Sequence, residues 1–191
     1  IFAQYRGSGQ TIVTSTATVH RIPLTVAKSP LYILASAQWD GPPRAGLQEH
    51  MVQLMIGDVD TQIWINHPGE WAPFGSGRPA YFAGNGTIPC VHQEGSTVTL
   101  TFRLEYGEVD FTHAYVPIDR FDEVVRRPDR WFLRKGTVFV EISAEQGLEL
   151  TTTGPFAGHE LVSPGRANRW VLQVATEREA GSFARFQRKR T

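Results

Sequence analysis

The sequence contains a single cysteine, Cys90, among its 191 residues. One cysteine excludes an intramolecular disulfide bond and any zinc site built from several thiolates, but it leaves the redox compartment open. The chain also lacks a run of the roughly 18 apolar residues that a membrane-spanning helix requires. It shows no charged start followed by an apolar core, the pattern of a signal peptide. The sequence therefore predicts no membrane span.

An excess of charge of one sign is also missing, because Lys and Arg together number 19 and so do Asp and Glu. A net charge of zero gives no long-range field that would attract nucleic acid or an anionic membrane. We therefore expect no nucleic-acid partner, and a polyanionic ligand would have to be held by local groups. The chain opens at Ile1 within strand-like sequence. We expect it to be part of a longer protein, for which a secreted or periplasmic location is one interpretation.

Long helical windows are scarce, because 18 glycines and 12 prolines divide the chain into short segments. A stable helix generally needs about 12–15 residues, whereas short alternating runs rich in β-branched residues predict strands. We therefore predict an all-β fold, a large antiparallel β-sandwich of two packed sheets that forms one domain over residues 1–191, with at most one or two short helices. The best helical candidate is residues 118–127. The strand candidates are residues 10–20, 31–37, 49–56, 61–66, 97–106, 131–133, 138–143, 148–152 and 170–175.

Residues 47–93 hold most of the chemistry-bearing side chains of the sequence. Two strand candidates at residues 49–56 and 61–66 come first, and the second ends where Pro68 and Gly69 follow His67. Proline cannot donate to a strand ladder, so the chain leaves the sheet there. Loops that leave a rigid scaffold carry much of protein function. We therefore expect His67 to face a cleft.

The long loop that follows combines glycines with aromatic, guanidinium and amide side chains. Aromatic rings stack on sugar faces, a guanidinium holds carboxylates, and amides bond hydroxyl groups. A loop longer than about 12–15 residues is usually functional or disordered, and this one is too aromatic for disorder. An ordinary connection whose aromatics cover the core is the alternative. The candidate ligand-binding residues of the loop are Glu70, Trp71, Arg78, Tyr81 and Asn85.

A second group of candidates lies in the motif FTHAY. His113 and Tyr115 are two residues apart, so on a strand both side chains project from the same face. A histidine and a tyrosine in that arrangement suit a proton-transfer pair. The alternative is a strand face that is exposed or that covers the core.

Several segments, taken in order, resemble a known family. They are QEHMVQLMIG, WINHPGE, SGRPAYFAGNGTIPCVHQ and FTHAYVPIDRFDEV, followed by a tail that ends in GSFARF. Together they resemble the C-terminal β-sandwich region of heparinase II/III-like polysaccharide lyases and related uncharacterised bacterial proteins. The resemblance rests on motif order and covers the chain from about residue 31 to about residue 186. In such proteins an α/α toroid precedes the sandwich, and the substrate lies between them.

The resemblance implies β-elimination at a uronic acid, in which Tyr and His remove the proton beside the carboxylate and assist the departing oxygen. It matches His50 to a sandwich histidine, and the HxHxD-like run of the best known members is absent. The candidate catalytic residues are therefore His50, His113 and Tyr115. The candidate substrate-binding residues are Gln48, His67, Glu70, Trp71, Arg78, Tyr81 and Asn85. The implied partners are a polysaccharide or oligosaccharide and a toroid of the same parent chain, and no cofactor is required.

Zinc is the alternative cofactor hypothesis, because zinc accepts histidine and carboxylate ligands. No H-x-H or H-E-x-x-H spacing is present, and scattered histidines are more often satisfied individually. The zinc candidates are His50, His67, His92, His113, Asp58, Asp60, Glu49 and Glu70.

Two classes of function remain open for this chain. They are the sandwich part of a polysaccharide lyase and a non-catalytic carbohydrate-binding or structural module.

Overall fold

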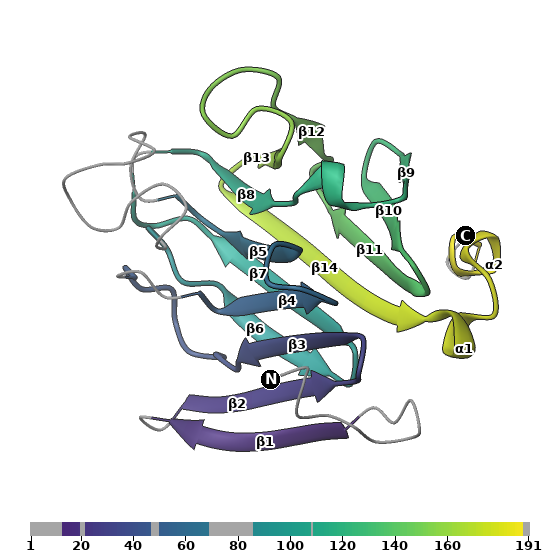
Figure 1. Cartoon of the computed structure of the whole chain (residues 1–191). Helices are drawn as coiled ribbons and strands as arrows, with labels where there is room; N and C mark the ends of the chain where they lie inside the picture. The colour runs from purple at the N-terminus through teal and green to yellow at the C-terminus, as the bar shows by residue number, and fades with distance from the viewer. Residues whose placement is uncertain (1–12, 20–21, 47–49, 69–85, 108, 189–191) are drawn as a thin grey trace.

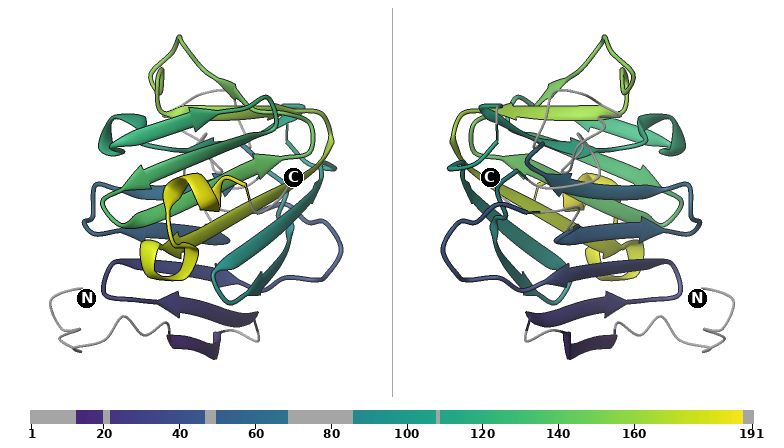
Figure 2. Two further views of the ribbon diagram at one scale, coloured as in Figure 1. Left: turned by 90° about the vertical axis from the view of Figure 1, so that its right-hand side faces the viewer. Right: turned by 90° about the vertical axis from the view of Figure 1, so that its left-hand side faces the viewer.

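The computed structural model describes residues 13–19, 22–46, 50–68, 86–107 and 109–188. They form two antiparallel sheets that pack face to face (Figures 1 and 2). The prediction of an all-β sandwich with two short helices is therefore confirmed.

The larger sheet has eight strands in the order β1-β2-β3-β4-β5-β8-β13-β12. Its strands are β1 (Val13–Val19), β2 (Ile22–Lys28), β3 (Tyr32–Ala37), β4 (Val52–Ile56), β5 (Gln62–Asn66), β8 (Phe111–Tyr115), β13 (Glu160–Pro164) and β12 (Glu149–Leu150). The smaller sheet has six strands in the order β6-β7-β14-β11-β10-β9. Its strands are β6 (Cys90–Glu94), β7 (Thr97–Arg103), β14 (Ala167–Thr176), β11 (Val138–Ala144), β10 (Arg130–Lys135) and β9 (Glu123–Arg126).

The main core lies between the sheets and follows from the period-two alternation of their strands. In β4, for example, Val52, Leu54 and Ile56 are buried while Gln53 is exposed. Successive strand residues point to opposite faces, so the apolar set of each strand faces the other sheet. A polar contact also joins the sheets, because the indole Nε1 of Trp170 donates to the hydroxyl of Thr112 over 2.7 Å.

Two short helices cover part of the outer face of the six-stranded sheet. They are α1 (Glu177–Ala180) and α2 (Phe183–Phe186). Phe183 and Phe186 pack against Phe139, and together with Phe132 they form a second, smaller core. A capping box starts α1, because Glu179 bonds the backbone and hydroxyl of the residue that precedes the helix.

The prediction of a helix at residues 118–127 is wrong. Only Ile118–Arg120 form a 3-10 turn, η2, and the chain then enters β9. Val124 packs against the main core and Val125 against the smaller one. A strand can bury β-branched neighbours on two opposite faces, so tertiary packing decided this segment. The strands β2, β6 and β13 were also absent from the candidates.

Candidate functional site

The predicted pair His113 and Tyr115 lies on the outer face of the eight-stranded sheet. In β8 the alternate residues turn inward, because Thr112 bonds a tryptophan of the other sheet and Ala114 belongs to the main core. His113 and Tyr115 therefore share the opposite face, as expected. The neighbouring strand β5 places Trp64 opposite Tyr115 in the ladder.

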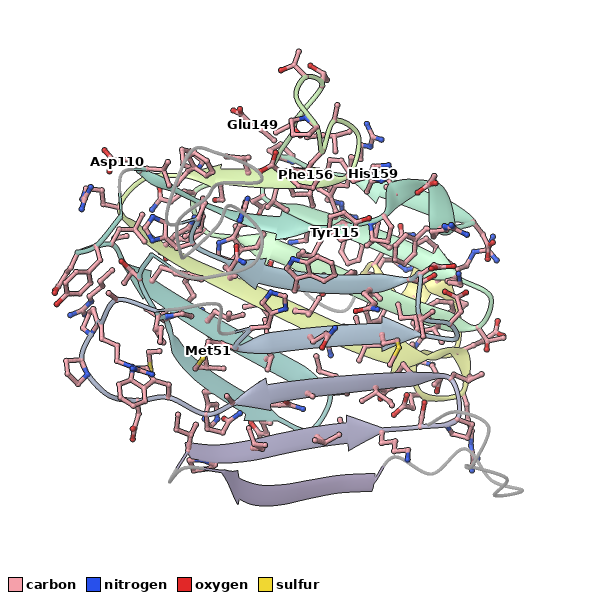
Figure 3. The ribbon with its side chains drawn as sticks, turned by 60° about the vertical axis from the view of Figure 1, so that its left-hand side comes forward. Met51, Asp110, Tyr115, Glu149, Phe156 and His159 are labelled. Carbon is pink, nitrogen blue, oxygen red and sulfur yellow. The ribbon has the colours of Figure 1, made fainter. Side chains whose placement is uncertain are left out.

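Four rings from neighbouring segments form a row across this face, which we call the ring row. The ring centroids of His50 and Trp64 are 5.6 Å apart, and those of Trp64 and Tyr115 are 4.5 Å apart, with nearly parallel planes in both pairs. His159 follows at 6.1 Å from Tyr115. Figure 3 shows Tyr115 near the middle of this face, with His159 and Phe156 on one side of it. The row therefore joins two sequence-predicted residues, His50 and Tyr115, through a tryptophan that was not a site candidate.

A buried histidine–carboxylate pair lies beside the ring row. The Nδ1 atom of His113 is 2.8 Å from Oε1 of Glu160, and both residues are almost fully buried. Because an ionised carboxylate only accepts hydrogen bonds, Nδ1 carries a proton and donates a hydrogen bond to Glu160. Glu160 is also the direct ladder partner of Tyr115. One carboxylate thus sits next to both members of the predicted proton-transfer pair.

His67 does not face a cleft, contrary to expectation, because it is fully buried. Its Nδ1 accepts the backbone N–H of Thr87 at 2.9 Å, and its Nε2 lies 3.0 Å from the carbonyl oxygen of Val109. Nδ1 is an acceptor, so Nε2 carries the proton and donates to that carbonyl. The pKa of His67 is lowered from 6.5 to about 4, with burial as the largest cause and with smaller lowering contributions from His113 and Arg166. We therefore assign His67 a structural role.

Three segments meet at this histidine, and we call the arrangement the His67 clasp. The backbone N–H of Gly86 donates to the carbonyl of His67 over 2.9 Å, and the hydroxyl of Thr87 exchanges hydrogen bonds with the backbone of Tyr106. Gly107 adopts φ +93°, and a Cβ there would lie 2.8 Å from Cε1 of the imidazole. The clasp therefore holds residues 67 and 86, on either side of the long loop, next to each other in space.

Six candidate residues lie outside the described residues, so their role stays a prediction. They are Gln48, Glu70, Trp71, Arg78, Tyr81 and Asn85. The structure describes the other four candidates. His50, His113 and Tyr115 lie on one face of the sheet, whereas His67 is enclosed by backbone.

The described residues contain no group of three or more His, Cys, Asp or Glu side chains that could hold a metal ion. Two of the zinc candidates lie in settings that do not resemble a metal site. His92 is exposed on the six-stranded sheet, and Asp58 forms an ion pair with Lys135 at 3.1 Å. Glu49 and Glu70 lie outside the described residues. In the part of the chain that the structure describes, no helix has the length and apolar character needed to cross a bilayer.

No family model, curated protein or solved structure matches the chain. The two-sheet antiparallel sandwich is therefore the part of the heparinase II/III-like resemblance that the structure supports. A fold shared by many proteins does not determine an activity, so the side chains of the site carry the functional information.

Proposed function

We propose that this chain is the β-sandwich part of a polysaccharide lyase that cleaves uronic-acid-containing glycans by β-elimination. The glycan would lie along the ring row on the outer face of the eight-stranded sheet. One observation carries the proposal: Tyr115 stands in the ring row at 4.5 Å from Trp64, directly beside the buried His113–Glu160 pair.

The chemistry of β-elimination fits these side chains. A base removes the proton beside the carboxylate, and an acid assists the departing glycosidic oxygen, so the site needs two groups that exchange protons. Tyr115 is half-buried and carries a phenolic hydroxyl. His113 donates from Nδ1 to Glu160, which leaves Nε2 as the ring nitrogen that accepts a proton. The carboxylate of the substrate would be neutralised by the predicted loop residues Arg78 or Asn85.

A non-catalytic carbohydrate-binding surface is the second candidate function. It is favoured by the complete burial of His113, because a side chain without exposed surface has to be uncovered before it can touch a sugar. The ring row alone would then provide the contact, since rings supply apolar surface together with polar atoms. The two functions differ in whether the hydroxyl of Tyr115 takes part in a reaction.

The first test measures turnover and binding by this chain alone. We expect no unsaturated product by ultraviolet absorbance, because positioning supplies about 7–11 kcal/mol of a barrier and is lost when catalytic groups are missing. Weak binding of a uronic-acid oligosaccharide should survive, with about 0.5–1.5 kcal/mol from each polar contact. Robust turnover by the isolated chain would refute a site divided between this chain and a helical partner.

Variants of the ring row then separate the two functions. Trp64→Ala should weaken oligosaccharide binding by about tenfold, the equivalent of one lost stacking contact. Tyr115→Phe keeps the ring and removes only the hydroxyl, so it should preserve binding and abolish turnover of the longer parent protein. Tyr106→Phe is the matched control, because Tyr106 is an exposed tyrosine that makes none of the ring contacts of the row. Unchanged turnover in Tyr115→Phe would leave the ring row with the binding function alone. Unchanged binding in Trp64→Ala would exclude this face of the sheet as the glycan-binding surface.

A further inference from the structure

A separate hollow lies at the edge of the six-stranded sheet. It has a volume of about 380 Å³, which is within the range of about 300–1,000 Å³ that small-molecule sites occupy. Cys90 and Thr101 face each other across the β6–β7 ladder on one side of it. The segment Asp40–Pro43 forms the other side. No residue of the ring row lines this hollow.

The wall formed by residues 39–44 is held in a fixed shape. The backbone of Trp39 pairs in both directions with Val91, and the N–H of Ile88 donates to the carbonyl of Arg44 over 2.8 Å. The guanidinium of Arg44 lies 5.1 Å from the centre of the Trp39 ring. Gly41 fits beneath this ring, since a Cβ there would lie only 2.5 Å from the indole. The hollow is therefore formed before any ligand arrives, which lowers the entropic cost of binding.

Two opposite charges line the hollow without neutralising each other. Arg103 and Asp40 both contribute to its lining, and among the residues that the structure describes the side chain of neither forms an ion pair or a hydrogen bond. The hydroxyl-bearing Thr101 is exposed beside them. Pro42, Pro43 and Ile88 add apolar surface. A few convergent polar groups on an apolar wall are the usual composition of a ligand site.

We propose that this hollow binds a small hydroxy acid or sugar acid. A guanidinium is suited to bidentate binding of a carboxylate, so Arg103 would hold the acid group. Asp40 only accepts hydrogen bonds when ionised, so it requires a donor such as a hydroxyl group on the same ligand. A simple anion brings no donor and is repelled by Asp40, while a neutral sugar leaves the guanidinium without its anion. The carbon skeleton would rest on the proline wall.

The only cysteine of the chain provides the assay, because Cys90 is exposed and lines the hollow. Alkylation of Cys90 by iodoacetamide, followed by intact mass, reports whether the hollow is occupied. Iodoacetamide is neutral, so salt does not steer it toward or away from the guanidinium. We expect sodium glucuronate or sodium lactate to slow the alkylation. Glucose, sodium acetate and sodium chloride at equal ionic strength should require about tenfold higher concentrations for the same protection, the equivalent of one charge-assisted contact.

The two acids distinguish the sources of the ligand, since glucuronate represents a sugar acid and lactate a simple hydroxy acid. Arg103→Gln should raise the half-protecting concentration of both by about tenfold. Arg178→Gln on α1, an exposed arginine that does not line the hollow, is the matched control and should behave as wild type. Protection by neither acid at about 100 mM, far above the millimolar range of a weak site, would overturn the proposal. Equal protection in wild type and Arg103→Gln would overturn it as well.

Discussion

The His67 clasp predicts that this protein loses stability as the pH falls from 6.5 to about 4. The neutral imidazole accepts the N–H of Thr87 at Nδ1 and donates to the carbonyl of Val109 from Nε2. A second proton would have to sit on Nδ1, where it would face another donor inside a buried site. This is the physical reason why the pKa of His67 is lowered to about 4, with burial as the largest cause.

The sign follows from comparing the folded and the unfolded chain. The unfolded chain binds this proton below pH 6.5, and the folded chain binds it only below about pH 4. Stability from this group is therefore complete above pH 6.5, is lost progressively toward pH 4, and falls no further below that. At about 1.4 kcal/mol per pH unit the full loss is about 3 kcal/mol, a large part of the about 5–15 kcal/mol that stabilises a typical domain.

The assay compares wild type with His67→Gln by urea unfolding, monitored by tryptophan fluorescence between pH 7 and pH 4. Glutamine can keep one of the two backbone hydrogen bonds, so the variant should lose about 1–3 kcal/mol at pH 7 through the group left unpaired. Glutamine cannot titrate, so the difference in free energy of unfolding between wild type and variant should narrow by about 3 kcal/mol at pH 4 and can reverse in sign. His92→Gln, at an exposed histidine, is the control and should follow wild type at every pH. A gap that stays constant from pH 7 to pH 4 would refute this reasoning.

Three further predictions concern other parts of the fold. Gly107→Ala should destabilise the protein more than Gly95→Ala in the same unfolding assay. Both glycines have positive φ, but only the Cβ at residue 107 meets the clasp imidazole, and equal losses would exclude that contact as the cause. Burial raises the pKa of Tyr32 above its usual 10, so the folded chain keeps this proton longer and stability is lost as the pH rises above 10. Tyr32→Phe should flatten the alkaline loss in thermal melts, and an unchanged alkaline slope would contradict this. Thr112→Val should cost about 1–3 kcal/mol, because the buried indole N–H of Trp170 loses its acceptor, and a melting temperature equal to wild type would show that the bond is dispensable.

The sandwich could be predicted because the sequence pattern of each strand is local. The alternating runs at residues 61–66 and 138–143 form the strands β5 and β11, and glycines and prolines mark the gaps between strands. Segment 118–127 failed because its local pattern of an acidic residue before apolar ones is equally compatible with a helical start. Its fate was decided by β10, which offers ladder partners to Val124 and Val125. That pairing is a tertiary property and has no local signature.

The candidate site could likewise be predicted only where local spacing determines it. The shared face of His113 and Tyr115 follows from a spacing of two, so the sequence was sufficient for it. Their partners are Glu160, which is 47 residues from His113 in the chain, and Trp64, which was known only as a strand residue. Both are brought in by the strand order β5-β8-β13, and that order exists because the β6–β7 hairpin between β5 and β8 joins the other sheet. His67 was misinterpreted for the same reason, since its carbonyl partner lies 42 residues away. A histidine at the end of a strand can face a cleft or close a clasp, and only the distant partner decides between them.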